Sequence, residues 1–287
     1  MRSLEAETEI AVPASCIWKS EARDYLRMPI QLSLAHKVAL VTGGSRGIGA
    51  ATVRIFAAAG AKVLFNYQLA RQQSEQLVNE VGPEQCAAVR CDLSQPESTG
   101  GLVESAVKKF GRLDILVANH GVWPATDTAI DQMPPAQWRR TLSINLDAVF
   151  SLTQHAVAQM KKQGKEHGVA GHIVFVSSTA GQRGEAFHCD YAASKGALIS
   201  MVKGLSTELA GDGIYVNCVA PGWVNTDMST PVLNDRNASK SILAAIPLGR
   251  VATAEEIAAP ILFLCTAHAG FITGEIFNVN GGAVLVG

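Results

Sequence analysis

The run KVALVTGGSRGIG, residues 37–49, decides the fold because it joins an apolar strand to a helix through a glycine turn. Val38–Val41 are apolar throughout, as is usual for a strand buried on both faces of a parallel sheet. Gly43, Gly47 and Gly49 let the chain turn tightly and bring backbone N–H groups to the start of the next helix. A turn of this kind at a helix N-terminus is typical of a pyrophosphate-binding site.

Short apolar runs alternate with longer segments of helical pattern along the rest of the chain. The predicted strands are Lys37–Thr42, Lys62–Asn66, Ala87–Cys91, Asp114–Ala118, His172–Ser177, Ile214–Ala220 and Ile276–Asn280, and the predicted helices lie near 47–59, 70–81, 96–110, 135–163, 190–210 and 253–267. Apolar strands separated by helices indicate a parallel sheet covered on both faces, and right-handed crossovers wind it doubly. The sequence therefore predicts an α/β fold: a single Rossmann-like, doubly wound domain with a seven-stranded parallel sheet.

Two segments lie outside this alternation. Residues 1–33 lack clear periodicity, and Met28 would serve as a complete start, so we expect 1–33 to be a non-native or mobile extension. The catalytic domain would then span residues 34–287. Residues 223–247 follow a predicted strand, at the edge where open α/β sheets bind ligands. We interpret this segment as a lid over the substrate, with an ordinary surface excursion as the alternative.

Composition excludes several function classes. The formal net charge is −1 and the pI is about 6.7, so the chain has no electrostatic footprint for nucleic acid or an anionic membrane. No apolar run reaches the ~18–20 residues that cross a bilayer. The six cysteines form no CxxC pair and no metal-ligand spacing, which indicates reduced thiols, no metal site and a cytoplasmic protein. His188 and Cys189 lack a third ligand, and we expect them to line a pocket.

A second motif carries proton-transfer chemistry. Tyr191 and Lys195 are one helical turn apart, so their side chains project from the same face. An ammonium beside a phenol favours the phenolate, which predicts a lowered pKa for Tyr191 and a role in general acid–base catalysis. Ser178 would hold the substrate oxygen, and Lys195 would also bond the ribose of a nicotinamide. Asn145 would bind a relay water through Lys195; alternatively its side chain satisfies helix backbone.

The cofactor preference depends on the end of the second strand. A carboxylate there would bind a ribose 2′-hydroxyl and repel a 2′-phosphate, but the strand ends in Asn66, followed by Tyr67. Arg46 could reach a 2′-phosphate, with help from Arg71. We therefore expect NADP(H), with NAD(H) as the alternative. Asp92 would accept a hydrogen bond from adenine; a helix N-cap, with the next helix starting at once, is the rival interpretation.

From about Ala35 to Gly287, the chain resembles the short-chain dehydrogenase/reductase family. The resemblance rests on TGGSRGIG (42–49), Asp92, NHG (119–121), Asn145, Ser178, YAASK (191–195) and PGWVNTDM (221–228). It implies a Rossmann-like domain, an Asn-Ser-Tyr-Lys tetrad and a homotetramer built on the long helices. It also implies that Val224 and Thr226 contact the nicotinamide carboxamide and the diphosphate. His120 departs from the family, whose members usually have Ala at this position.

The candidate catalytic residues are thus Asn145, Ser178, Tyr191 and Lys195. The candidate cofactor-binding residues are Gly43, Ser45, Arg46, Gly47, Ile48, Gly49, Asn66, Tyr67, Asp92, Leu93, Asn119, Gly121, Tyr191, Lys195, Pro221, Gly222, Val224 and Thr226.

Within the family the chain is similar to 3-oxoacyl-(acyl-carrier-protein) reductases and related secondary-alcohol dehydrogenases. Carrier-protein reductases tend to carry basic residues where the helix after YAASK ends, but this helix ends in STELAGDG (206–213). An acidic carrier would be repelled there. Aromatic and apolar residues around the expected pocket favour a small to medium, apolar or mixed substrate; they are Trp123, Phe187, Trp223 and Met228.

The sequence therefore predicts an NADP(H)-dependent oxidoreductase that interconverts a carbonyl and a secondary alcohol. The alternatives are a 3-oxoacyl-(acyl-carrier-protein) reductase and an NAD-dependent sugar- or steroid-type alcohol dehydrogenase. Epimerisation or dehalogenation on the same fold usually shows as a replaced glycine turn or tetrad, and neither is replaced here. A regulator that binds cofactor without turnover is disfavoured because Tyr191 and Lys195 are both present.

Overall fold

The computed structural model describes residues 31–286. The extension predicted at 1–33 therefore lies almost wholly outside the described residues. Within them, seven strands form one sheet in the order β3-β2-β1-β4-β5-β6-β7, and every neighbouring pair is parallel.

The strands agree with the predicted ones to within one residue at each end. They are β1 Val38–Val41, β2 Lys62–Tyr67, β3 Cys86–Arg90, β4 Ile115–Ala118, β5 Gly171–Val176, β6 Ile214–Pro221 and β7 Ile276–Val279. The reversal of strand order between β1 and β4 marks the point where a doubly wound sheet opens a ligand-binding crevice. The predicted α/β fold class is confirmed.

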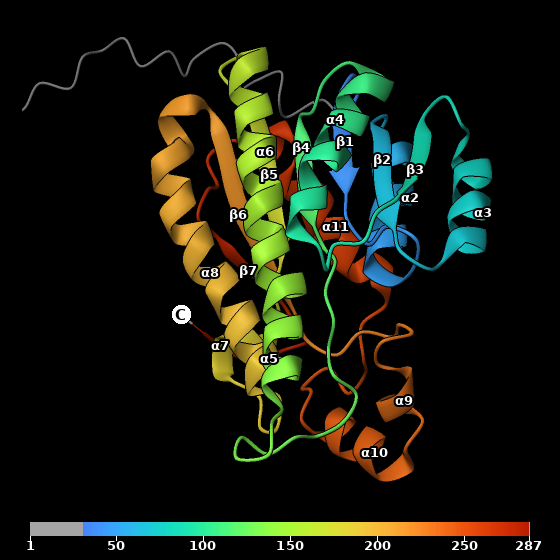
Figure 1. Cartoon of the computed structure of the whole chain (residues 1–287), viewed down its shortest axis with the longest axis vertical. Coiled ribbons are helices and arrows are strands. Elements are labelled where there is room, and N and C mark those ends of the chain that lie inside the picture. The colour runs from blue at the N-terminus through green and yellow to red at the C-terminus, as the bar shows by residue number, and fades with distance from the viewer. Residues whose placement is uncertain (1–30, 287) are drawn as a thin grey trace, which may run out of the picture. The chain divides into compact units, whose positions relative to one another are not determined.

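Helices cover both faces of the sheet, as Figure 1 shows with α6 and α8 in front and α11 behind. The main helices are α2 Gly47–Ala58, α3 Arg71–Val81, α4 Thr99–Phe110, α5 Pro135–Leu142, α6 Ala148–Gln163, α8 Cys189–Leu209 and α11 Ala254–Leu264. Two hydrophobic clusters result, because successive strand residues point to opposite faces. Leu40 packs with Leu152 of α6 and Leu198 of α8, whereas Val41 packs with Phe56 of α2 and Ile257 of α11.

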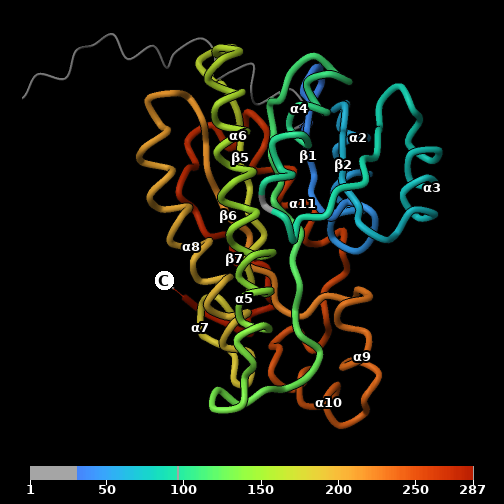
Figure 2. The backbone as a smooth tube through the Cα atoms, viewed as in Figure 1, coloured from blue at the N-terminus to red at the C-terminus, as the bar shows by residue number. Residues whose placement is uncertain are grey.

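Three features depart from the predicted helices. The segment predicted as one helix over 135–163 is interrupted by a π turn at Ser143–Asp147, between α5 and α6. A five-residue helix, α7 Thr179–Arg183, follows β5 and was too short to show a periodic pattern. The predicted lid at 223–247 contains α9 Thr230–Leu233 and α10 Arg236–Ala244, which Figures 1 and 2 place beyond the end of the sheet.

In the part of the chain that the structure describes, no helix is long and apolar enough to cross a membrane. The five cysteines found there are free thiols, and Cys86, Cys218 and Cys265 are buried.

Helices α7 and α8 approach so closely that Gly181 has no room for a side chain. A Cβ on Gly181 would lie 2.6 Å from the carbonyl carbon of Lys195 and 2.8 Å from the nitrogen of Gly196. Both neighbours are backbone atoms of α8 and cannot turn away. The contact therefore sets the distance between the segment after β5 and the helix that bears Tyr191.

We expect Gly181→Ala to lower the free energy of unfolding by about 1–3 kcal/mol, because the added methyl forces α7 and α8 apart. Gly204→Ala on the same α8 is the matched control, since no atom lies within 4 Å of the Cβ it would add. It should stabilise the protein by about 0.5–1 kcal/mol by restricting the unfolded chain. Urea unfolding measures both, and equal effects of the two substitutions would contradict the assigned contact.

Candidate active site

A cavity of about 590 Å³ opens at the carboxyl ends of the strands, where the glycine turn, the loop after β4 and the segment after β6 meet. Every predicted cofactor residue except Gly49 lines this cavity, and so do Ser178, Tyr191 and Lys195. Asn145 does not line it. Further lining residues that the sequence analysis did not single out include Gln68, Arg140, Arg183, Glu185 and Asp227.

The glycine turn has the shape of an anion cradle. Gly43 and Gly47 have φ angles of 62° and 52°, a region that side chains rarely adopt. A Cβ on Gly49 would lie 2.1 Å from the carbonyl oxygen of Gly43, so only glycine fits at this position of the turn. No side chain caps the N-terminus of α2, which leaves its first N–H groups free to bind an anion. These residues fit the pyrophosphate of a dinucleotide.

Asn66 lines the cavity but is largely buried, and its side-chain amide holds the glycine turn in place. Its Oδ1 accepts a hydrogen bond from the backbone N–H of Gly43 at 2.8 Å, and its Nδ2 donates to the carbonyl of Cys91 at 3.1 Å. One amide side chain thus joins the ends of β1, β2 and β3. The side chains that remain for a ribose at this place are those of Tyr67 and Gln68.

Asp92 lines the cavity without being a helix N-cap. Its Oδ1 accepts a hydrogen bond from the backbone N–H of Ser94 at 2.9 Å, and this bond lowers the pKa of the carboxyl. The regular helix starts only at Thr99, after a short 3₁₀ turn. The rival interpretation, a helix beginning at Leu93, is therefore wrong.

The two arginines considered for a 2′-phosphate differ in position. Arg46 lines the cavity, and its Nη1 lies 3.4 Å from Oδ2 of Asp227. Both side chains are exposed, so this ion pair contributes little and can open for a ligand. Arg71 does not line the cavity; its Nε donates to Glu75 at 2.7 Å along the first turn of α3.

Ser178, Tyr191 and Lys195 meet on one wall of the cavity. Lys195 is buried on α8, and its Nζ donates to the carbonyl oxygen of Val176 at 2.8 Å. The same Nζ lies 5.8 Å from the centre of the Tyr191 ring. The Ser178 side chain is close enough to Tyr191 to affect the pKa of its phenol. Ser178 also caps α7, because its Oγ accepts from the N–H of Ala180 at 3.1 Å. The structure thus brings three of the four predicted catalytic side chains together.

The expected lowering of the Tyr191 pKa is wrong for the residues that surround it in the structure. Burial raises the pKa of Tyr191 to about 12, and the nearby Ser178 side chain only partly offsets this. Burial also lowers the pKa of Lys195 to about 8. Loss of solvation disfavours the charged form of each group, and this effect outweighs the attraction that the spacing suggested.

Asn145 lies in the π turn Ser143–Asp147, and π turns inside helices are common at functional sites. Its Oδ1 accepts from the N–H of Val122 at 2.8 Å, and its Nδ2 donates to the carbonyl of Val122 and to Ser194 Oγ. The side chain therefore binds protein groups, although these are the backbone of a loop residue and a serine hydroxyl rather than the helix backbone of the alternative interpretation. A Cβ on Gly121 would lie 3.3 Å from both Asn145 Oδ1 and Lys195 Nζ, so these two atoms border one small space.

His120 replaces the usual alanine with a buried bridge. Its Nδ1 lies 2.8 Å from Oγ1 of Thr42, at the start of the glycine turn, and its Nε2 lies 3.0 Å from the carbonyl oxygen of Ile144, in the π turn. Burial lowers the pKa of His120 to about 3, with a further contribution from the positive charge of Lys195. The neutral ring therefore connects the cofactor cradle to the segment that carries Asn145.

The open end of the cavity is aromatic. Trp123 packs edge-on against Trp223 with 6.2 Å between ring centres and stacks on His188 at 4.7 Å. Met228 also lines the cavity. His188 does not: it is buried behind Trp123, where its Nε2 contacts the carbonyl oxygen of Pro124 at 2.9 Å.

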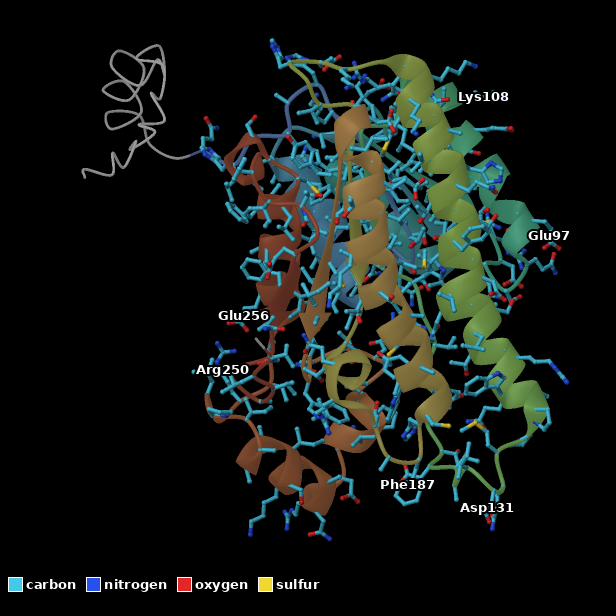
Figure 3. The ribbon with its side chains drawn as sticks, turned by 90° about the vertical axis from the view of Figure 1, so that its left-hand side faces the viewer. Glu97, Lys108, Asp131, Phe187, Arg250 and Glu256 are labelled. Carbon is cyan, nitrogen blue, oxygen red and sulfur yellow. The ribbon has the colours of Figure 1, made fainter. Side chains whose placement is uncertain are left out.

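Two other residues that we expected to line the cavity also lie outside it. Cys189 does not line the cavity, and Phe187 is 54% exposed on the loop before α8, as Figure 3 shows. Phe187 has a φ angle of 65°, which turns the chain so that the following residue, rather than Phe187 itself, packs inward. Within residues 31–286, no three His, Cys, Asp or Glu side chains gather as a metal site requires.

Comparison with known proteins identifies relatives over nearly the whole described chain. The model of a family described as enoyl-(acyl carrier protein) reductase matches residues 43–284. The 3-oxoacyl-[acyl-carrier-protein] reductase of Synechocystis sp. is 38% identical over 256 residues, covering 88% of this chain and 99% of the relative. The enzyme of the same name from Escherichia coli is 37% identical over 250 residues, covering 87% and 98%.

Solved structures agree. A short-chain dehydrogenase/reductase of Brucella melitensis, described as glucose/ribitol dehydrogenase, superposes with a TM-score of 0.81 at 34% identity, covering 90% of this chain and 100% of its own. A 3-ketoacyl-(acyl-carrier-protein) reductase of the same organism, complexed with NADH, has a TM-score of 0.81 at 30% identity, with 88% and 100% covered. A putative NAD(P)-dependent gluconate 5-dehydrogenase of Beutenbergia cavernae, with bound NADP, has a TM-score of 0.80 at 32% identity, covering 88% and 99%.

The burial of Lys195 predicts a pH dependence of stability. Its pKa is about 8 in the folded protein and ordinarily 10.5, so between these pH values the unfolded chain holds more protons at this group. The free energy of unfolding of the wild type should therefore rise with pH in this window, relative to that of Lys195→Met. Urea unfolding across the window measures the difference.

Lys203→Met, which removes an exposed lysine from the same helix, is the control. Its free energy of unfolding should follow that of the wild type at every pH. If the Lys195→Met protein follows the wild type in the same way, the ammonium is not held in a low-polarity environment.

Proposed function

The chain belongs to the short-chain dehydrogenase/reductase family of NAD(P)-dependent oxidoreductases. We propose that it interconverts a carbonyl group and a secondary alcohol with NADP(H). In this proposal Tyr191 is the general acid and base. One observation carries it: Ser178, Tyr191 and Lys195 line the same cavity as the glycine turn, whose backbone fits a pyrophosphate.

The roles of the side chains follow from their contacts. A bound nicotinamide would supply or accept the hydride. Ser178 would donate a hydrogen bond to the substrate oxygen, and Tyr191 would give that oxygen its proton during reduction. With its pKa raised by burial, Tyr191 is protonated at neutral pH, as reduction requires. Lys195 would fix the position of α8, and so of Tyr191, through its hydrogen bond to the carbonyl oxygen of Val176. It would also reach the ribose of the cofactor.

The aromatic end of the cavity supports a substrate of small to medium size. Trp123 and Trp223 offer apolar surface there, while Glu185 and Arg183 add polar groups. This combination suits a mixed rather than a wholly apolar substrate.

Reduction of 3-oxoacyl groups on an acyl carrier protein is the second candidate, favoured by the names of the relatives at 37–38% identity. The surface at the end of α8 bears on this choice. Glu208 is exposed there, whereas Asp212 is paired with Lys161 at 2.6 Å, so the region is less acidic than the sequence alone implied. Comparing a 3-oxoacyl group on carrier protein with the same group on coenzyme A separates the candidates. A clear preference for the carrier-bound form would establish the second one.

We expect Tyr191→Phe to reduce kcat for ketone reduction by about 100- to 10,000-fold, because the proton donor is lost. The affinity for NADPH should be preserved, because the cradle at Gly43 and Gly47 is untouched. Tyr215→Phe is the control, as Tyr215 stacks on His172 outside the cavity. Stopped-flow kinetics and NADPH titration measure both quantities. Full turnover by the Tyr191→Phe protein would overturn the assignment.

The cofactor preference has its own test. Arg46→Ala should lower kcat/KM for NADPH about tenfold by removing a charge-assisted contact to the 2′-phosphate, and should leave kcat/KM for NADH nearly unchanged. Arg71→Ala is the matched control, since Arg71 does not line the cavity. Equal losses with both cofactors would contradict the role of Arg46, and a wild type that prefers NADH would contradict the preference itself. The homotetramer and the cytoplasmic location stay predictions.

A further inference from the structure

Glu185 brings a carboxylate into the substrate end of the cavity. It lies on the loop between α7 and α8 and lines the same cavity as Ser178 and Tyr191. Its side chain is only 20% exposed. Oε1 accepts a hydrogen bond from Nε1 of Trp123 at 3.2 Å, which fixes the carboxylate against the aromatic wall. Neither the glycine turn nor the proton-transfer residues require an acid at this place.

Several charged groups act on the Glu185 carboxyl, and this carboxyl in turn acts on Tyr191. Burial raises the pKa of its carboxyl, while His188, the Trp123 hydrogen bond and Arg183 act to lower it and Asp127 acts to raise it. Its own negative charge contributes to the raised pKa of Tyr191. The carboxylate therefore acts electrostatically on the hydroxyl at which the substrate oxygen would bind.

We propose that Glu185 is a specificity determinant: it selects carbonyl substrates that carry a hydrogen-bond donor, a hydroxyl or an ammonium group, beside the reacting carbonyl. It rejects substrates that carry a carboxylate or a phosphate there. The carboxylate oxygens accept hydrogen bonds from a donor, whereas a second negative charge beside the partly buried carboxylate is repelled. This inference rests on the proposed carbonyl–alcohol chemistry.

Trp123 makes this selection rigid. The indole is held between Trp223 and His188, and His188 is anchored by the carbonyl oxygen of Pro124. A carboxylate bound to such a fixed indole cannot swing away from an unsuitable substrate. A substrate that carries a hydrogen-bond donor therefore finds the carboxylate of Glu185 already in position, and little conformational freedom is lost on binding.

The test compares three ketones of similar size: hydroxyacetone, butanone and pyruvate. Wild type should use hydroxyacetone best and pyruvate worst. Glu185→Gln removes the charge and should raise kcat/KM for pyruvate relative to butanone by at least about tenfold. Glu185→Leu removes the acceptor as well and should lower kcat/KM for hydroxyacetone relative to butanone by about tenfold. Unchanged ratios in both variants would overturn the inference.

Asp127→Asn is the matched control. Asp127 carries the same charge near His188, at 3.8 Å, but it is exposed and does not line the cavity. Its removal should leave all three substrate ratios as in the wild type. In alcohol oxidation, Glu185→Gln should move the pH profile to lower pH, because loss of a neighbouring negative charge lowers the pKa of Tyr191. A purely structural role of Glu185 would not move that profile.

A separate measurement distinguishes failure of the inference from failure of the proposed function. Absence of NADPH oxidation with every ketone would refute the proposed function. The affinities of the same three ketones for NADPH-loaded Tyr191→Phe protein, with and without Glu185→Gln, are measurable by ligand-observed NMR without turnover. Weaker binding of pyruvate than of hydroxyacetone, relieved by Glu185→Gln, would support the selection. Equal affinities in both proteins would refute it.

Discussion

The hydrogen bond between the buried ammonium of Lys195 and the carbonyl oxygen of Val176 is the contact on which the active site depends. It ties α8 to the last residue of β5. Ser177 adds a second bond in the opposite direction, since its Oγ donates to the carbonyl of Lys195 at 2.8 Å. Val176 and Ser177, at the carboxyl end of β5, thus bind Lys195 through its side-chain ammonium and its backbone carbonyl respectively. Ser178 and Tyr191 meet because these bonds, with the close packing at Gly181, leave α8 no freedom to slide.

At the cofactor end, the amide of Asn66 has a comparable role. The amide accepts a hydrogen bond from the N–H of Gly43 and donates one to the carbonyl oxygen of Cys91. A side chain at this position must therefore offer both an acceptor and a donor. A carboxylate could accept from Gly43 but could not donate to Cys91. An amide rather than an acid at the end of β2 therefore has a structural cause in addition to any cofactor preference. The proposed preference for NADP(H) then depends mainly on Arg46, which lines the cavity.

The sequence predicted the sheet closely because all seven strands are short apolar runs between helices. All the predicted cofactor residues except Gly49 line the cavity, because glycine turns and strand ends mark the crevice. The prediction from sequence failed where the outcome depends on environment. The pKa of Tyr191 follows burial, which spacing along a helix does not reveal. The exposure of Phe187 follows a positive φ angle at a non-glycine residue, for which the sequence carries no marker. Glu185 stood within the motif from Ser178 to Tyr191, and its position could have drawn attention to it.

The electrostatics of the cavity bear differently on the two directions of the proposed reaction. Burial raises the pKa of Tyr191 and lowers that of Lys195, so the ligand-free site stabilises a neutral phenol beside a less basic amine. The charge of Glu185 acts on Tyr191 in the same sense. Carbonyl reduction starts from the protonated tyrosine, which this environment provides, whereas alcohol oxidation starts from the phenolate, which it opposes. Oxidation therefore requires additional positive charge near the phenol, and the oxidised nicotinamide is the part of the ternary complex that carries it. The carboxylate of Glu185 makes that requirement stricter, because it also raises the pKa of Tyr191.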